Sequence, residues 1–240
     1  MNSFKAQTLA EALALALVDL SDNGEIVETP DWQRPGSNEK RYRKELSVTY
    51  TAAAPYPVTE ISYAFTDTPE ALNRYIAELA FGSNDHLVAE GKRPYEYHER
   101  IAEQLTWVAD ELTRNPLSTR AVAVVRRPDD LKMSEPPCLT SLTFQIRSGK
   151  LKMFADFRSN DAFNAAAEND VALVTLQADM AKKLGVTVGS FTKIAKSFHA
   201  YDRDVGRLTE FAARYKQSCR AGIDVEDFFD GTGAALTGIE

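Results

Sequence analysis

The sequence predicts an α+β fold: a mixed β-sheet covered by helices, with one long helix buried against it. Three observations support this prediction. Helical and strand segments follow one another in a mixed order, residues 139–157 have the pattern of a two-strand hairpin, and residues 160–184 are Ala-rich and apolar nearly all round after Asp170. With no internal repeat or clear linker in 240 residues, we expect a single domain spanning residues 1–240.

The first half of the chain supplies most of the covering helices. Leucines spaced between alanines predict the first helix, which Asp22-Asn23-Gly24 ends. Thr68 and Pro69 are a typical helix start, since a threonine caps the first turn and proline fits its first position. The predicted elements are helix 5–21, loop 25–40, strands 44–50 and 58–65, helix 68–82, loop 83–94 and helix 96–113.

The second half supplies the centre of the sheet. Residues 119–125 are β-branched and mostly apolar, which is typical of a buried strand. Asn160 or Asp161 is expected to cap the long helix, and Gly185 to end it. The predicted elements are strand 119–125, loop 126–136, hairpin strands 139–146 and 151–157, helix 160–184, strand 190–200 and a last helix from Asp202 to Cys219.

The composition excludes several classes of protein. A net charge of -7 argues against a general nucleic-acid or anionic-membrane surface, although one arginine cluster can still hold one anion. Two cysteines and three histidines show neither a secreted disulfide framework nor zinc spacing, so we expect no metal. The apolar run at residues 9–20 is too short and too charged for a membrane span, and nothing near it resembles a signal peptide. We expect a cytoplasmic protein.

Cys138 is the first candidate for chemistry. It follows Pro136-Pro137, which stiffen the backbone, and it lies at the start of a predicted strand. Arg158, at the far end of the returning strand, is placed to fold back beside it and stabilise a thiolate. These features favour a nucleophile, and the alternative is a buried structural thiol, the commonest role of a lone cysteine.

Arg158-Ser159 is a candidate anion site. The pair comes just before the predicted long helix, where a guanidinium, a hydroxyl and free backbone N–H groups would converge on one phosphate. The alternative is an arginine in solvent.

Three more polar residues follow. Asn169 lies on a small-residue side of the predicted long helix, and a buried amide presents both a donor and an acceptor to the edge of a uracil-type ring. His199 and Tyr201 are two residues apart on a strand and so share a face, where they would bond a sugar hydroxyl or be surface residues at a strand end.

Together these motifs resemble one family. The order Pro-Pro-Cys, hairpin, Arg-Ser-x-Asp, Asn on the next helix and then His-x-Tyr resembles the thymidylate synthases, with spacings that agree without gaps from Cys138 to His199. The resemblance is strong over residues 115–203, weaker over 34–114, and nearest to the short archaeal or phage-type members. It implies the thymidylate synthase fold, with a homodimer formed through the sheet.

The resemblance implies roles for the nucleophile and its anion ligands. Cys138 matches the thiolate that adds to C6 of the pyrimidine, which turns C5 into a carbon nucleophile. Arg158 and Ser159 match phosphate ligands, and Arg120 matches the arginine that reaches the partner subunit's phosphate in a homodimer. Arg34, in Arg-Pro-Gly, resembles the mobile arginine that closes on the same phosphate.

The resemblance also implies how base and sugar are read. Asn169 matches the amide that selects uracil over cytosine, and His199 and Tyr201 match ligands of the 3′-hydroxyl, which together favour dUMP. Asp161 matches the carboxylate at the folate and pyrimidine face.

Two further residues have less specific matches. Glu78 matches the glutamate that organises water and relays protons, with a solvated helix glutamate as the alternative. Tyr97 matches the family's active-site tyrosine.

The implied reaction is transfer of a one-carbon unit from 5,10-methylenetetrahydrofolate to C5 of dUMP, giving dTMP. Some positions depart from the family pattern. Leu139 replaces the usual histidine after the cysteine, Thr119 replaces one of two arginines, and no tryptophan lies between Gly82 and Tyr97 to shield the intermediate. The thinner shielding keeps a dUMP hydroxymethylase open, or less favourably a dCMP hydroxymethylase, in which water adds instead. A non-catalytic nucleotide-binding relative is a second alternative, and a plain structural domain with a buried thiol is a third.

Overall fold

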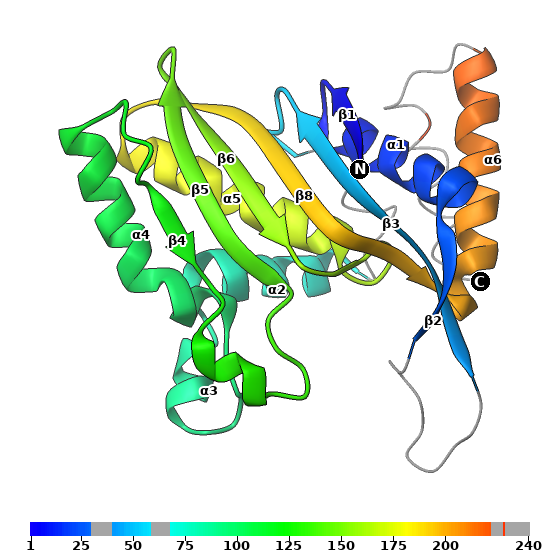
Figure 1. Ribbon diagram of the computed structural model, residues 1–240. Helices are drawn as coiled ribbons and strands as arrows, with labels where there is room; N and C mark the ends of the chain where they lie inside the picture. The colour runs from blue at the N-terminus through cyan, green and yellow to red at the C-terminus, as the bar shows by residue number, and fades with distance from the viewer. Residues whose placement is uncertain (30–39, 59–67, 222–227, 229–240) are drawn as a thin grey trace.

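The computed structural model describes residues 1–29, 40–58, 68–221 and Phe228. Within them the chain forms the predicted α+β architecture, a mixed sheet with helices packed on it (Figure 1). The α-helices are α1 (Leu9–Asn23), α2 (Pro69–Phe81), α3 (Asp85–Ala89), α4 (Tyr97–Arg114), α5 (Ala166–Lys183) and α6 (Val205–Ala221). The strands are β1 (Asn2–Ala6), β2 (Glu25–Thr29), β3 (Arg41–Ala52), β4 (Val122–Val124), β5 (Leu139–Arg147), β6 (Lys150–Phe157), β7 (Asn160–Asp161) and β8 (Thr187–Tyr201).

The sheet runs in the order β1-β3-β8-β6-β5-β4, with β2 beside β3 and β7 beside β8. Strand β8 is its centre, because it pairs antiparallel with β3 and parallel with β6 and β7. The predicted hairpin is confirmed: β5 and β6 pair antiparallel across a two-residue turn. Ser148 and Gly149 both have positive φ, 52° and 70°, as a tight hairpin turn requires.

Helix α5 is buried along the sheet, as its apolar surface predicted. It lies behind β6 and β8 in Figure 1, and its buried side chains include Val171, Leu173 and Met180. The amide of Gln177, fully buried, donates to the Leu151 carbonyl at 2.7 Å. That hydrogen bond replaces the contact of the amide N–H group with water.

Some boundaries and elements differ from those predicted. Helix α5 begins at Ala166 and not at Asn160, because residues 160–161 pair with β8 as a short strand. Asp161 caps a turn, accepting from the Phe163 and Asn164 N–H groups at 2.9 and 3.0 Å, so the prediction that Asn160 or Asp161 caps the long helix was wrong.

Sheet pairing and short helices account for the other differences. Residues 2–6 form β1 beside β3, and α1 begins only after Thr8, whose hydroxyl accepts from the Glu11 N–H. The predicted loops contain β2, α3 and the 3-10 helix η2 (Pro128–Lys132). Another 3-10 helix, η3 (Asp202–Asp204), leads into α6. The predicted strand 58–65 lies largely outside the described residues.

Strand β4 is shorter than predicted and lies at the sheet edge. Val124, expected to be buried, is 47% exposed. The side-chain amide of Gln104, on α4, accepts from the Val124 backbone N–H and donates to the Val124 carbonyl, both at 2.8 Å. A side chain thus satisfies backbone groups that would otherwise form an open edge.

Two glycines at helix ends give a test of this packing. Gly82 and Gly185 have φ of +68° and +66°, but a Cβ on Gly82 would lie 2.3 Å from His98 Nδ1, whereas a Cβ on Gly185 meets nothing within 4 Å. We expect Gly185→Ala to lower the free energy of unfolding by about 1 kcal/mol through backbone strain alone. Gly82→Ala adds the clash with the His98–Asp85 pair and should cost clearly more. Equal losses in urea denaturation would contradict the packing around Gly82.

Candidate active site

Arg158 fixes the loop that carries Cys138. Its Nε donates to the Pro137 carbonyl at 3.1 Å and its Nη2 to the Pro136 carbonyl at 2.7 Å. Its backbone N–H donates to the Cys138 carbonyl at 2.9 Å. The prediction that Arg158 folds back is therefore confirmed for the loop before Cys138, because the guanidinium binds the carbonyls of that loop. The thiol itself is reduced and half-buried, immediately before β5.

Two tyrosines lie against Cys138. The rings of Tyr95 and Tyr97 are 5.8 Å apart, centre to centre. Burial raises the pKa of the Tyr97 hydroxyl, and the negative charge of the Cys138 thiolate raises it further, while the backbone N–H groups of Leu139 and Cys138 act in the opposite direction. Tyr97 is therefore protonated at neutral pH, and it can donate a hydrogen bond near the sulfur but cannot act there as a base.

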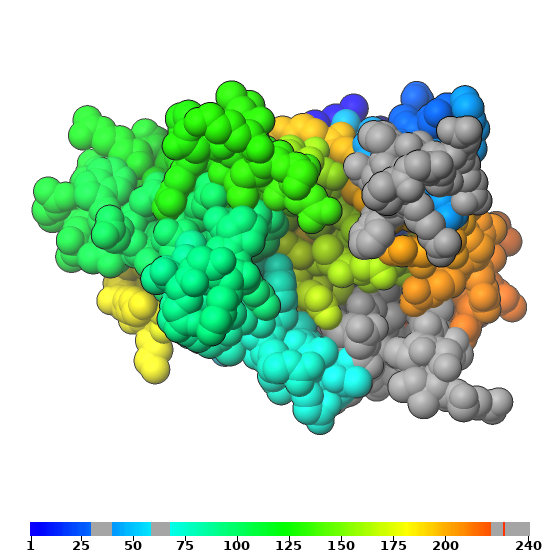
Figure 2. All heavy atoms as spheres, turned by 90° about the horizontal axis from the view of Figure 1, so that it is seen from below, coloured from blue at the N-terminus to red at the C-terminus, as the bar shows by residue number. Residues whose placement is uncertain are grey.

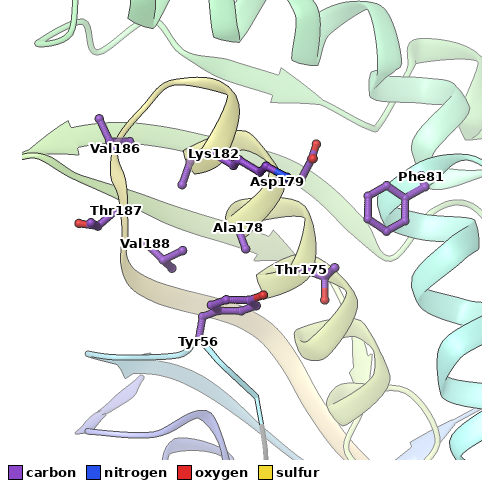
Figure 3. Close-up of a pocket in the computed structure, with 10 residues that line it drawn as sticks. Tyr56, Phe81, Thr175, Ala178, Asp179, Lys182, Val186, Thr187 and Val188 are labelled. Atoms are coloured by element: carbon purple, nitrogen blue, oxygen red, sulfur yellow. The ribbon is translucent and has the colours of Figure 1, made fainter.

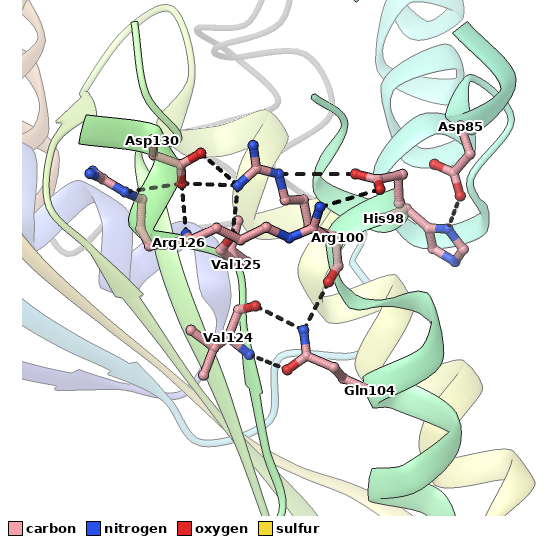
Figure 4. A network of polar contacts seen from close by, with 10 residues as sticks. Asp85, His98, Arg100, Gln104, Val124, Val125, Arg126 and Asp130 are labelled. Atoms are coloured by element: carbon pink, nitrogen blue, oxygen red, sulfur yellow. Dashed lines mark hydrogen bonds and ion pairs between the residues drawn. The ribbon is translucent and has the colours of Figure 1, made fainter. Parts of the chain in front are cut away.

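An ion-pair network joins α4 to the chain between β4 and Cys138 (Figure 4). Arg100 of α4 is buried, and its Nη1 lies 2.8 Å from Asp130 Oδ1, while Arg126 Nε lies 3.3 Å from Asp130 Oδ2. Arg100 also lies 5.2 Å from the centre of the Tyr95 ring. Burial alone would raise the pKa of the Asp130 carboxyl, but the Arg127 backbone N–H and the Arg100 and Arg126 guanidinium groups lower it. The network connects α4, which begins at Tyr97, to the chain that leads into Cys138.

Asp161 and His199 form the second part of the site. They are partners in the β7–β8 ladder, and the Ala162 N–H donates to the His199 carbonyl at 2.8 Å. The His199 ring is 2% exposed; its Nδ1 lies 3.3 Å from the Ser197 carbonyl, and its Nε2 has no hydrogen-bond partner among the described residues. The Tyr201 ring lies 4.9 Å away, edge-on, as the shared strand face predicted.

Burial lowers the pKa of His199, and the Asp161 carboxylate opposes that shift. The imidazole is therefore neutral at pH 7. With the proton on Nδ1, facing the Ser197 carbonyl, Nε2 presents a lone pair to a hydroxyl group.

Asn169 lies in the first turn of α5, nearer the helix start than its predicted place two to three turns along. Its side chain is 5% exposed and its Nδ2 donates to the Ala165 carbonyl. Because α5 begins at Ala166, the predicted convergence of Arg158-Ser159 with a helix N-terminus does not occur: Ser159 precedes the short strand β7 instead. Figure 2 shows the yellow-green segment that follows β6 at the bottom of a recess, between the green segment before β5 and the cyan atoms of α2.

Glu78 lies near this cluster but not on the cysteine. Its carboxylate is 3.5 Å from Arg93 Nη1, and it contributes, with Tyr97 and Glu168, to raising the pKa of the buried Tyr75. The predicted water-organising role of Glu78 stays a prediction.

Arg120 does not join the cluster. It is exposed just before β4, where the Ala121 carbonyl accepts from the Phe144 N–H, so it lies beside the later residues of β5. Residues 139 and 145 are six positions apart, which puts this end of β5 roughly 20 Å from Cys138. Arg34 lies outside the described residues.

A cavity of about 590 Å³ lies elsewhere, against the C-terminal half of α5 and the start of β8 (Figure 3). Tyr56, Thr175 and Val188 are among its lining residues, and none of the predicted active-site residues that the structure describes lines it. Across the described part of the chain, no group of three or more His, Cys, Asp or Glu side chains is placed to hold a metal ion. In that same part no helix combines the length and apolarity needed to cross a bilayer.

Comparisons with known proteins give the family of this chain. The family model for thymidylate synthase matches residues 70–231, more than half of the chain. The chain belongs to the thymidylate synthase family.

Individual thymidylate synthase relatives extend the match. A Methanocaldococcus jannaschii protein named "Putative thymidylate synthase" is 30% identical over 88% of this chain and 96% of its own length. The "Deoxyuridylate hydroxymethyltransferase" of Bacillus phage SP01 is 35% identical over 45% of this chain and 30% of its own. The solved structure of thermostable thymidylate synthase A from Bacillus subtilis superposes with a TM-score of 0.65 at 19% identity, covering 86% of this chain and 84% of that one. It supports the fold.

The structure adds residues that the sequence did not single out. Tyr95 lies beside Tyr97. The only feature of the sequence that could have indicated this is its position two residues before Tyr97. Arg100 and Asp130 are 30 positions apart, so nothing local predicts that they pair. Behind His199, Ser197 Oγ donates to Glu45 Oε2 at 2.7 Å, and Arg43 lies 2.6 Å from the same carboxylate.

The pKa of His199 leads to a pH prediction. Between the unfolded value near 6.5 and the lower folded value, only the unfolded chain takes up the proton, so the folded protein loses stability as pH falls through this window. The wild type should lose up to about 1.4 kcal/mol of unfolding free energy per pH unit in this window because of His199, and His199→Asn should remove that loss. Denaturation of the wild type and the variant at several pH values measures it. His86→Asn, at an exposed histidine of α3, is the control and should leave the slope unchanged. An unchanged slope in His199→Asn would contradict the assignment.

Proposed function

We propose that this chain transfers a one-carbon unit from 5,10-methylenetetrahydrofolate to C5 of dUMP, giving dTMP, with residues 1–240 acting as one catalytic unit. The observation that carries the proposal is the placement of a reduced, half-buried Cys138 by Arg158 at the sheet edge where β7 and β8 bring Asp161 and His199. That arrangement supplies a nucleophile, a cation, a carboxylate and a neutral imidazole at one edge of the sheet.

Cys138 supplies the covalent step. Its thiolate forms a bond to C6 of the pyrimidine, and the C5=C6 electron pair moves to C5 and the O4 carbonyl. C5 then forms a bond to the one-carbon unit and gives its proton to ordered water. For a methyl product, that unit would be reduced by a hydride from the folate, which would leave as dihydrofolate, while the C5=C6 bond re-forms and the thiolate leaves. Arg158, whose guanidinium binds the carbonyl of the residue before Cys138, supplies positive charge beside the nucleophile.

The remaining residues hold the nucleotide. Arg158 has N–H groups beyond the two that bind the Pro136 and Pro137 carbonyls, and with Ser159 it holds the phosphate. Neutral His199 accepts from the 3′-hydroxyl through Nε2, beside Tyr201. The Asn169 amide reads the uracil edge once it exchanges its bond to the Ala165 carbonyl for the base.

The donor set also fits a flat, hydrogen-bonding co-substrate. Asp161 accepts three hydrogen bonds, from two backbone N–H groups and from Asn164 Nδ2 at 2.8 Å, which leaves one acceptor position open. The Tyr95 and Tyr97 rings supply aromatic surface at Cys138. When bound, methylenetetrahydrofolate supplies the one-carbon unit, and Glu78 orders water for proton transfer.

A homodimer completes the proposal. The uncovered face of the central strands carries half-buried Phe154 and Ile194, which suits a second copy of the chain. Arg120 lies toward the end of β5 that is far from its own Cys138, so it is placed to reach a partner's phosphate rather than its own.

Hydroxymethyl transfer to the same dUMP is the second candidate. The phage hydroxymethyltransferase relative and the lack of tryptophan between Gly82 and Tyr97 favour it. Methyl formation requires a hydride, whereas hydroxymethyl formation requires only water at the intermediate, and the two products differ by one oxygen atom. Product mass after incubation with dUMP and methylenetetrahydrofolate separates the two reactions, and a hydroxymethyl product without dihydrofolate would overturn the synthase proposal.

Cys138→Ser tests the covalent step. Serine keeps the shape but is a far weaker nucleophile, so tritium release from C5-labelled dUMP should fall about 10³-fold or more. The dissociation constant for dUMP should stay within about threefold, because binding rests on other residues. Cys219→Ser, at the exposed cysteine of α6, is the matched control and should be active. A wild type that binds dUMP without releasing tritium would instead support a non-catalytic relative.

Subunit mixing tests the shared site. Arg120→Ala and Cys138→Ala chains are each expected to be inactive, but a heterodimer keeps one site with both groups. Random exchange should restore up to about one quarter of wild-type activity, since half of the dimers are mixed. Arg114→Ala, at an exposed arginine of α4, should be active without mixing. No recovery after confirmed exchange would contradict the role of Arg120 across the interface.

A further inference from the structure

A fully buried ion pair lies beneath the candidate site and takes no part in the chemistry described above. Lys193 of β8 and Asp170 of α5 are both 0% exposed, with Nζ and Oδ1 2.6 Å apart. The hydroxyl of Tyr50, on β3, donates to the other carboxylate oxygen at 2.5 Å. The cluster thus connects the two central strands to the helix that covers them.

The environment of the pair supports charges without water. Lys193 Nζ lies 3.3 Å from the Ala166 carbonyl in the first turn of α5, and 4.6 Å from the centre of the Phe157 ring. Burial raises the pKa of Asp170 and lowers that of Lys193, and the attraction between the two groups opposes both shifts. Each partner therefore depends on the other to remain charged in the core.

Stability alone does not explain such a pair. Replacing a buried ion pair by apolar side chains of similar volume is often neutral or stabilising in proteins. What an apolar contact lacks is direction: an ammonium that must meet a carboxylate, a carbonyl and a ring face fixes both the rotation of a helix and its position along its axis.

The two elements that the pair connects also carry the residues proposed to read the nucleotide. Asn169 immediately precedes Asp170 in the first turn of α5. His199 and Tyr201 lie further along β8 from Lys193. The Asn169 N–H donates to the Ala165 carbonyl at 2.9 Å, so the amide side chain follows any movement of that turn.

We propose that Lys193, Asp170 and Tyr50 are positioning residues that set the first turn of α5 against β8, and thereby place the Asn169 amide relative to the sugar ligands His199 and Tyr201. The proposal rests on the proposed function for its substrate, dUMP. The cluster touches neither base nor sugar and acts on selectivity only through Asn169.

The first test replaces both charges in the full chain, with Lys193→Met and Asp170→Leu together. Hydrogen exchange of the unliganded protein should become at least about tenfold faster at residues 166–170 and stay unchanged at 176–183. The matched control is Lys183→Met with Asp179→Leu, which removes a partly exposed ion pair of 2.7 Å from the last turns of the same helix. The control should leave exchange at residues 166–170 unchanged.

The second test measures binding by calorimetry. The double variant should bind dUMP at least about tenfold more weakly and lose most of its preference over dCMP, because a displaced amide no longer meets the uracil edge. In an Asn169→Ala background the same double change should have little further effect on dUMP affinity. Such non-additivity distinguishes positioning of Asn169 from general loosening of the core.

Tyr50→Phe provides a milder variant in case the double variant does not fold. It removes only the hydroxyl that bonds Asp170 and should shift exchange and selectivity in the same direction by a smaller factor. A folded variant with wild-type exchange at residues 166–170, or with unchanged dUMP affinity and selectivity, would overturn the proposal. A wild-type protein that binds no dUMP would instead contradict the proposed function. The hydrogen-exchange measurement would still decide whether the cluster holds the first turn of α5 in place.

Discussion

The packing of α5 against β6 and β8 is the constraint on which the rest of the structure depends. The helix is apolar on nearly every side, so it can be stable only where other elements cover it, here the sheet together with α2. Gly189 permits close approach of the strands, since a Cβ there would lie 2.8 Å from the Leu151 carbonyl. Gln177 then donates to that same carbonyl and fixes the helix at the place where β6 and β8 meet.

The direction of the strands turns this packing into a site. Strands β6 and β8 are parallel, so their C-terminal ends emerge at the same edge of the sheet. Strand β5 is antiparallel to β6 and therefore begins at that edge, which brings Cys138 to Arg158. The short strand β7 returns the chain to β8 and sets Asp161 opposite His199. Residues far apart in the sequence thus converge through strand direction.

Local signals explain what the sequence predicted well. The hairpin, the Thr68 cap with Pro69 and the burial of α5 all follow from patterns within a few residues. Strand pairing overrode local pattern where the predictions failed: residues 2–6 became β1 beside β3, and residues 160–161 joined β8 before α5 began. Within the site, the prolines before Cys138 and the hairpin after it were enough to predict that Arg158 folds back to the Cys138 loop.

Long-range ion pairs were not predictable, because a single charged residue does not indicate its partner. Lys193 and Asp170 each have the sequence context of a surface charge, yet both are fully buried. Arg100 and Asp130 are likewise joined only by the fold. Such long-range contacts hold the elements of the site in place. The sequence therefore predicted which residues belong to the candidate site better than it predicted how they are arranged.

The charge of the proposed substrate connects the site to the second subunit. A nucleotide monophosphate carries close to two negative charges at neutral pH. Arg158 has already committed Nε and one Nη2 hydrogen to proline carbonyls, so its remaining donors face the phosphate from one side only. The chain's own charge of -7 does not help to hold an anion. Arg120 lies beside the end of β5 that is far from Cys138, so it cannot supply the missing cation within its own chain. Under the proposed function, the partner subunit is therefore a component of the phosphate site.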